Sequence, residues 1–170
     1  MSTSRYGLML LWMVAFTWVG EGLTEAGQCH DIRADLDRHG EEPTTAYAFS
    51  GTISSGLLRG SYSVVVNDVA VTPAGDLSVG GSYSYLAGLT ITTDHGTLTG
   101  ATLGVGVLHA QIRTTELAPA APFAETHSVT GGTGRFAGAT GRLFMTGDHL
   151  VVTPTGWDAE GQVNGQVCLP

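Results

Sequence analysis

Alternation with a period of two residues runs through most of this chain and constrains its fold more than any other feature. From Thr45 onward, short segments carry apolar residues at every second position, with small or hydroxyl residues between them. A β-strand with one buried face produces this pattern, because successive side chains point to opposite faces of the sheet. Turn-forming residues recur at short intervals, and no segment has a convincing helical period. The sequence therefore predicts an all-β fold.

Glycines inside the expected strands favour a closed sheet over a flat sandwich. Glycine weakens a strand and is tolerated mainly at bends, bulges and barrel corners. Such glycines occur in most of the alternating segments, at Gly51, Gly60, Gly81, Gly100, Gly147 and Gly165. We therefore predict a closed antiparallel β-barrel of about eight strands, formed as a single domain by residues 45–170.

Turn signals set the expected limits of several strands. Asn67 and Asp68 are expected to separate two strands, and residues 94–96 to close a hairpin. We expect the proline-bearing residues 118–123 to form a loop and residues 154–158 to turn the chain before the last strand.

Residues 1–26 differ from the rest of the chain and predict a signal peptide. Arg5 is followed by an apolar run, and Ala26 is a small residue at the expected cleavage point. The run is shorter than the roughly 20 residues that span a bilayer. An uncleaved membrane anchor and a buried amphipathic helix are the alternatives. We expect a secreted or periplasmic protein whose mature form has no stable membrane span.

Two cysteines lie near the two ends of the expected mature chain. Residues 27–44 are polar and acidic, and we interpret them as a solvated N-terminal arm that contains Cys29. Cys168 lies two residues before the last residue, Pro170. In an oxidising compartment these cysteines are expected to form one disulfide. Two free thiols or a lipid-modified Cys29 are the alternatives, and the cysteines do not form a recognisable zinc pattern, so we expect no metal.

Charge and composition exclude several classes of partner and cofactor. The chain has seven basic residues, all arginine, against fifteen acidic ones, for a net charge of −8. It offers no surface that would neutralise phosphates, so we expect no nucleic-acid binding. Without lysine there is no pyridoxal phosphate Schiff base and no phosphate-loop lysine. We expect no cofactor.

A glycine-rich segment follows Val129 and imitates a dinucleotide-binding fingerprint. Gly132, Gly134 and Ala137 satisfy the spacing GxGxxA. A true fingerprint opens a helix and is followed by a large doubly wound fold. Here too little chain follows, and it alternates with period two. We therefore interpret the segment as a structural loop built on Gly131, Gly132, Gly134, Phe136 and Gly141.

The same segment, GGTGRFAGATG at residues 131–141, resembles the GGTGxF motif shared by the dirigent proteins and the allene oxide cyclase barrel family, especially their small secreted bacterial relatives. The resemblance implies an eight-stranded antiparallel barrel with an apolar interior. The motif would then be a tight crossover between strands, with Phe136 plugging one end of the core and several glycines at positive φ. The resemblance does not extend to the N-terminal arm.

The resemblance does not carry either plant activity to this chain. In plant dirigent proteins the motif continues to Ala-Arg-Gly, and that arginine is one of the pocket residues. The matching residues here are Ala139, Thr140 and Gly141, so the arginine is missing. The pocket residues of allene oxide cyclases have no recognisable match in this sequence.

Five residues are candidates for contact with a ligand inside the barrel. They share strand parity with expected core residues, and they are Tyr62, Tyr83, Tyr85, His109 and His149. Aromatic rings that merely fill the core and histidines at the rim are the alternatives. No catalytic residue can be assigned, because the serines lack a nucleophile elbow and the histidines lack a paired carboxylate.

Two functions remain from the sequence. The first is a secreted barrel that binds a small hydrophobic molecule or serves as a structural module. The alternative is a cofactor-free cyclase or isomerase, in which the cavity folds a reactive substrate and excludes water. Secretion favours the first, since cyclases of biosynthetic pathways act on intracellular intermediates. The sequence leaves open whether the protein is an enzyme and what its oligomeric state is.

Overall fold

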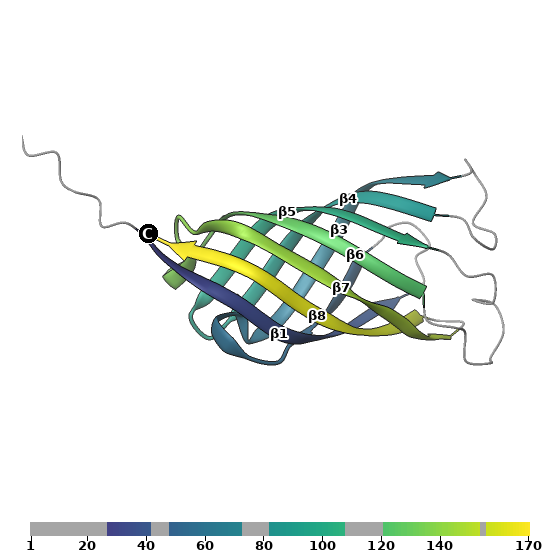
Figure 1. The fold of residues 1–170 in the computed structure, drawn as a ribbon, viewed down its shortest axis with the longest axis horizontal. Coiled ribbons are helices and arrows are strands. Elements are labelled where there is room, and N and C mark those ends of the chain that lie inside the picture. Colours follow the sequence, from purple (N-terminus) through teal and green to yellow (C-terminus); the bar gives the residue numbers. More distant parts are fainter. Residues whose placement is uncertain (1–26, 42–47, 73–81, 108–120, 154–155) are drawn as a thin grey trace, which may run out of the picture.

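Eight antiparallel strands close into a barrel in chain order, and β8 pairs back onto β1 (Figure 1). This computed structural model describes residues 27–41, 48–72, 82–107, 121–153 and 156–170. The predicted closed antiparallel β-barrel is confirmed. Two short 3-10 helices, η1 and η2, connect strands. The elements are β1 (Gln28–Glu41), β2 (Ala48–Ile53), η1 (Gly56–Leu58), β3 (Gly60–Thr72), β4 (Ser82–Thr93), β5 (Gly96–Val107), β6 (Ala121–Gly132), η2 (Gly134–Phe136), β7 (Thr140–Thr153) and β8 (Gly156–Leu169).

Residues 28–41, which the sequence analysis placed in a solvated arm, form strand β1, so that interpretation is wrong. Ile32, Ala34 and Leu36 are buried in the barrel, whereas the residues between them are exposed. The strand has one apolar face, which the many charges on its outer face concealed. β1 pairs with β8 along its whole length, so it is the strand that closes the barrel.

The predicted disulfide between Cys29 and Cys168 is confirmed. The two cysteines lie opposite each other in the register of β1 and β8. The bond therefore joins the first and last strands at the end of the barrel where the chain terminates. None of the helices among the described residues is long and apolar enough to cross a membrane.

Several expected turns lie inside strands instead. Asn67 and Asp68 do not end a strand, because β3 continues past them with a register shift between Val66 and Asp68. This is a β-bulge, which interrupts the alternation without breaking the strand. β6 begins at Ala121, inside the expected loop 118–123, and β8 begins at Gly156, inside the expected turn 154–158. The hairpin at residues 94–96 joins β4 to β5 as expected.

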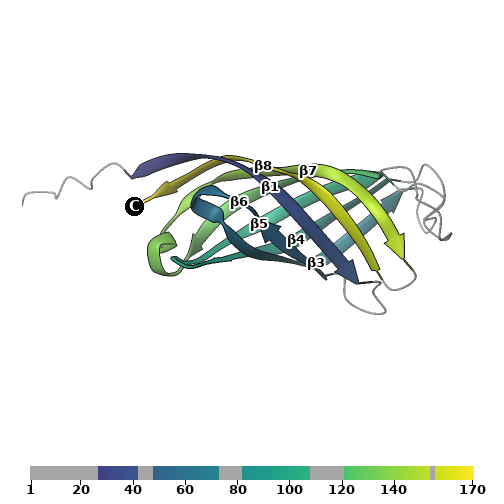
Figure 2. The ribbon, with the colours of Figure 1, turned by 90° about the horizontal axis from the view of Figure 1, so that it is seen from below.

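The glycine-rich segment closes one end of the barrel, where η1 and η2 lie beside the chain terminus (Figure 2). Phe136 in η2 and Leu58 in η1 are fully buried. Gly131 has a φ of 140° and Gly134 a φ of 58°, conformations that only glycine adopts at little cost. An apolar core fills this half of the barrel, and β1, β3, β5 and β7 run from it toward the opposite end.

Candidate functional site

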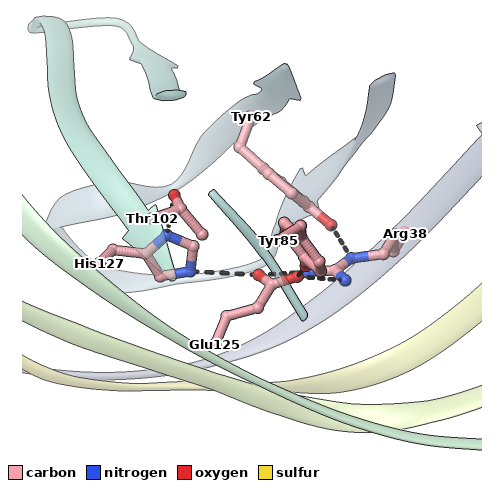
Figure 3. Close-up of polar contacts among 6 residues, drawn as sticks. All are labelled: Arg38, Tyr62, Tyr85, Thr102, Glu125 and His127. Atoms are coloured by element: carbon pink, nitrogen blue, oxygen red, sulfur yellow. Dashed lines mark hydrogen bonds and ion pairs between the residues drawn. The ribbon is translucent and has the colours of Figure 1, made fainter. Parts of the chain in front are cut away.

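A salt bridge crosses the barrel interior between two strands that are not neighbours (Figure 3). Arg38 of β1 donates from Nη1 to Oε1 of Glu125 and from Nη2 to Oε2, both over 2.7 Å. Glu125 belongs to β6 and shares its inward parity with Phe123 and His127. Arg38 is 4% exposed and Glu125 is 2% exposed, so water screens neither charge. The two residues form a bidentate pair of the strong, planar kind.

Aromatic rings surround the guanidinium of Arg38. Its central carbon lies 4.3 Å from the ring centroid of Phe49 and 4.0 Å from that of Phe123. Its Nε donates to the hydroxyl oxygen of Tyr62 over 3.0 Å. Because β1 continues the alternation of its apolar residues, Arg38 occupies the inward position that follows Leu36. The cation is thus held by a carboxylate at its tip and by aromatic rings around it.

Glu125 makes further polar contacts on its other sides. The hydroxyl of Tyr85 donates to its Oε1. Nε2 of His127 lies 3.2 Å from its Oε2, and Nδ1 of the same ring lies 2.7 Å from the hydroxyl of Thr102. The contact with Thr102 is a hydrogen bond, whereas Nε2 approaches Oε2 without the geometry of one. Four other side chains therefore converge on the ion pair, directly or through His127, from β3, β4, β5 and β6.

Two glycines of β5 make room for tyrosines of β4. Gly104 and Gly106 lie opposite Tyr85 and Tyr83 in the strand register. A Cβ at either glycine would overlap the ring of its tyrosine. The two rings stack on each other, with centroids 6.1 Å apart and planes 14° apart. The glycines thus allow the tyrosines to lie across β5 beside Glu125.

Gly104→Ala is therefore expected to displace the Tyr85 ring and break its hydrogen bond to Glu125. A buried acceptor that loses its donor costs about 1–3 kcal/mol of stability. Gly88→Ala is the matched control, because an added Cβ there has no neighbour within 4 Å. Urea unfolding of the two variants measures the difference, and equal stabilities would show that Tyr85 is not fixed by the glycine.

Burial and the ion pair shift the pKa values of the site in opposite directions. Burial works against the charge of Glu125, but the interaction with His127 and the charge of Arg38 outweigh it and lower its pKa from 4.5 to about 2. Burial also works against the charge of Arg38, but Glu125 raises its pKa overall. Burial raises the pKa of Tyr62 and of Tyr83 to about 12, and it raises that of Tyr85 as well.

These pKa values limit the chemistry of the site. A general acid or base works best with a pKa near the working pH. Glu125 is ionised and the three tyrosines are neutral over the whole physiological range. The arrangement therefore suits fixed charges and hydrogen-bond donors that hold a molecule, rather than proton transfer by Glu125 or the tyrosines.

The low pKa of Glu125 predicts acid sensitivity. A group whose pKa is lowered on folding stabilises the folded state above its unfolded pKa, and this contribution is lost as the pH falls toward its folded pKa. We expect the Glu125 contribution to disappear between about pH 4.5 and about pH 2. The double variant Arg38→Met/Glu125→Leu has no carboxylate at this position, so it lacks this contribution to stability. Denaturant titrations at several pH values compare the two proteins, and parallel pH profiles across that window would contradict the prediction.

The structure brings together three of the five sequence-predicted site residues. Tyr62 and Tyr85 bond directly to the ion pair, and Tyr83 stacks on Tyr85. His109 lies outside the described residues. His149 lies in β7, where it pairs with Ala121 and Ala159, but its side chain is outside the described part.

The charged centre of the site was not predicted from the sequence. Arg38, Glu125, His127 and Thr102 were all missed. The available signal was strand parity, because Glu125 and His127 alternate in step with Phe123 and Val129. A charged residue at an inward position of a barrel strand is the feature to look for in such sequences.

An open depression of about 470 Å³ lies on the outer surface, over β1, β7 and β8. Its lining includes four carboxylates, Asp35, Asp37, Asp148 and Glu160. The described residues contain no group of three or more His, Cys, Asp or Glu side chains placed to hold a metal ion. The four carboxylates are exposed, whereas Arg38 and Glu125 are buried and paired, so the interior ion pair is the stronger candidate for a functional site.

No protein-family model matches the sequence, and no curated protein or solved structure gives a significant match to it.

Proposed function

We propose that this protein is an exported, non-catalytic barrel that binds a small, mainly apolar molecule beside the Arg38–Glu125 pair. The observation that carries the proposal is the bidentate ion pair itself, buried among Phe49, Phe123 and three tyrosines. Apolar side chains with one polar centre are the usual lining of a small-molecule site. The disulfide supports export, since such bonds persist in oxidising compartments.

A purely structural role explains the ion pair less well. Desolvating two charges costs several kcal/mol per ion, and replacing a buried pair by apolar residues of similar volume is often neutral or stabilising. The opposite half of this barrel is filled with apolar residues and contains no such pair among its described side chains. Because apolar residues could fill this position at little cost in stability, the presence of the ion pair supports a role in recognition.

A cofactor-free cyclase or isomerase is the second candidate function. The specific observation in its favour is a set of fixed donors and charges in apolar surroundings, which can stabilise charge that develops in a bound substrate. The closed barrel and its glycine-rich crossover also support the proposed relationship to the allene oxide cyclase and dirigent barrels. The pKa values disfavour proton transfer by Glu125 or the tyrosines, so such an enzyme would act by folding its substrate.

Binding of the neutral fluorescent probe N-phenylnaphthylamine tests the proposed function. We expect a saturable rise in fluorescence with one site per chain of wild-type protein. The variant Arg38→Met/Glu125→Leu is expected to keep the circular dichroism of a folded barrel and to bind at least about tenfold more weakly, because the polar centre and its aromatic frame are rearranged. Absence of saturable binding to the wild type, or equal binding by the variant, would contradict the proposal.

The two candidate functions differ in what happens to the natural ligand. A cyclase or isomerase conserves the mass of its substrate but changes its structure. Organic extraction of the protein from its native source, followed by chromatography of the extract before and after incubation with fresh protein, separates the cases. A new species of unchanged mass supports the enzyme, and an unchanged molecule supports the binding protein.

A further inference from the structure

The hydroxyl of Tyr62 holds an unused proton inside the barrel. Tyr62 is 2% exposed, and its hydroxyl oxygen accepts the hydrogen bond from Nε of Arg38. A phenolic hydroxyl can accept and also donate one hydrogen bond. The described part of the chain supplies no acceptor for the Tyr62 proton. Figure 3 shows this hydroxyl directed toward the charged centre.

The acceptors of the site are already occupied. Glu125 takes two hydrogen bonds from Arg38 and one from Tyr85, and His127 lies against it as well. Thr102 is engaged with His127. Among the described side chains of the site, Nε2 of His127 is a buried polar atom with no hydrogen-bond partner, although it lies 3.2 Å from Oε2 of Glu125. The hydrogen bonds that the site can still form are therefore mainly ones in which the protein is the donor.

We propose that Tyr62 donates its hydroxyl proton to an uncharged carbonyl oxygen of the apolar molecule bound in the barrel. This inference rests on the proposed function and specifies the ligand class, an apolar ketone, aldehyde, ester or amide. The hydrogen bond from Arg38 polarises the Tyr62 hydroxyl and strengthens it as a donor, because chained hydrogen bonds reinforce one another in apolar surroundings.

Charge balance favours a carbonyl over a carboxylate or an amine. The charge of Arg38 is already offset by Glu125 at 2.7 Å, so a ligand carboxylate would be a second anion near Glu125 with no free cation among the described groups of the site. An amine would bring donors to a site whose carboxylate oxygens are already occupied. Because burial raises the pKa of Tyr62 to about 12, its proton is present at physiological pH.

Three naphthalene derivatives of similar size test the inference. They are acetylnaphthalene, which is a ketone; ethylnaphthalene, its hydrocarbon counterpart; and naphthoate, a carboxylate. We expect wild-type protein to bind the ketone about three- to tenfold more tightly than the hydrocarbon, which is the usual range for one hydrogen bond, and to bind the carboxylate most weakly. Equilibrium dialysis measures the three dissociation constants.

Tyr62→Phe is expected to remove the preference for the ketone, so that the ketone binds no more tightly than the hydrocarbon. Binding of the hydrocarbon reports whether this variant still folds into a binding-competent barrel. Ser61→Ala is the matched control, since it removes the exposed hydroxyl next to Tyr62 on the outer face of β3. It should retain the full preference.

Infrared spectroscopy of the bound ketone gives a second measurement. A hydrogen bond lowers the carbonyl stretching frequency, so we expect the lowered band in wild type and Ser61→Ala and its loss in Tyr62→Phe. Equal affinities for ketone and hydrocarbon in wild type, or an unshifted band, would overturn the inference and leave the proposed binding function intact. Tightest binding of naphthoate would also overturn it. Failure of all three compounds to bind would contradict the proposed function itself.

Discussion

Replacing one member of the Arg38–Glu125 pair alone is expected to lower the free energy of unfolding by about 3–5 kcal/mol, because the partner is left as an unpaired charge in the barrel interior. In Arg38→Met, Glu125 keeps only Tyr85 and His127 as partners. In Glu125→Leu, the guanidinium stays between Phe49 and Phe123 with no carboxylate. Each loss is a large fraction of the stability of an ordinary domain.

The double variant Arg38→Met/Glu125→Leu is expected to recover most of that loss. It removes both charges and fills their place with side chains of similar size, so its free energy of unfolding should lie within about 1 kcal/mol of wild type or above it. Urea unfolding of the four proteins gives a double-mutant cycle, and the coupling energy follows directly. Where a single variant does not fold, the free energies of unfolding of the double variant and wild type still show whether the pair is needed for stability.

Asp158→Asn serves as the control for this cycle. Asp158 pairs with His39, the neighbour of Arg38 on the outer face of β1, and both side chains are 60% exposed. An exposed pair contributes less than about 1 kcal/mol. If the double variant lost as much as the two single variants together, the pair would be structural and the argument for recognition would fail.

The fold could be predicted from the sequence because its main determinant is local. Alternation with period two, interrupted by glycines, specifies strands that bury one face and bend, although the limits of several strands were misplaced and one strand was not predicted. β1 was missed for a physical reason. Its outward residues Asp31, Arg33, Asp35 and Asp37 give the segment a solvated composition, and its inward residues include Ala34, which is too small to mark a core position clearly.

The site could be predicted only in part, since it depends on contacts across the barrel. Strand parity identified Tyr62, Tyr83 and Tyr85 as inward residues. Arg38 and Glu125 lie on β1 and β6, which are not neighbours, and no sequence spacing shows that their side chains meet. Gly106 and Gly104 leave space for the rings of Tyr83 and Tyr85, and this also depends on the register of β4 against β5. Closure of the barrel, rather than any motif, assembles the site.

Removing the disulfide through Cys29→Ala/Cys168→Ala is expected to lower the free energy of unfolding by about 4–5 kcal/mol. The bond joins residues 139 positions apart. On the chain-entropy model, a cross-link that closes so long a loop destabilises the unfolded chain by about this amount. Urea unfolding of the variant, and of wild type with and without reductant, measures the loss.

Kinetics show whether the disulfide acts through the unfolded chain. β1 and β8 remain paired along their length without the bond, so folding should slow while unfolding changes little. A variant that unfolds faster but folds at the wild-type rate would contradict this account and assign the effect to the folded barrel. Cys29 is the second residue of β1 and Arg38 lies near the end of that strand, so the folded variant is expected to bind N-phenylnaphthylamine as wild type does. The disulfide then stabilises the barrel at one end, independently of the site at the other.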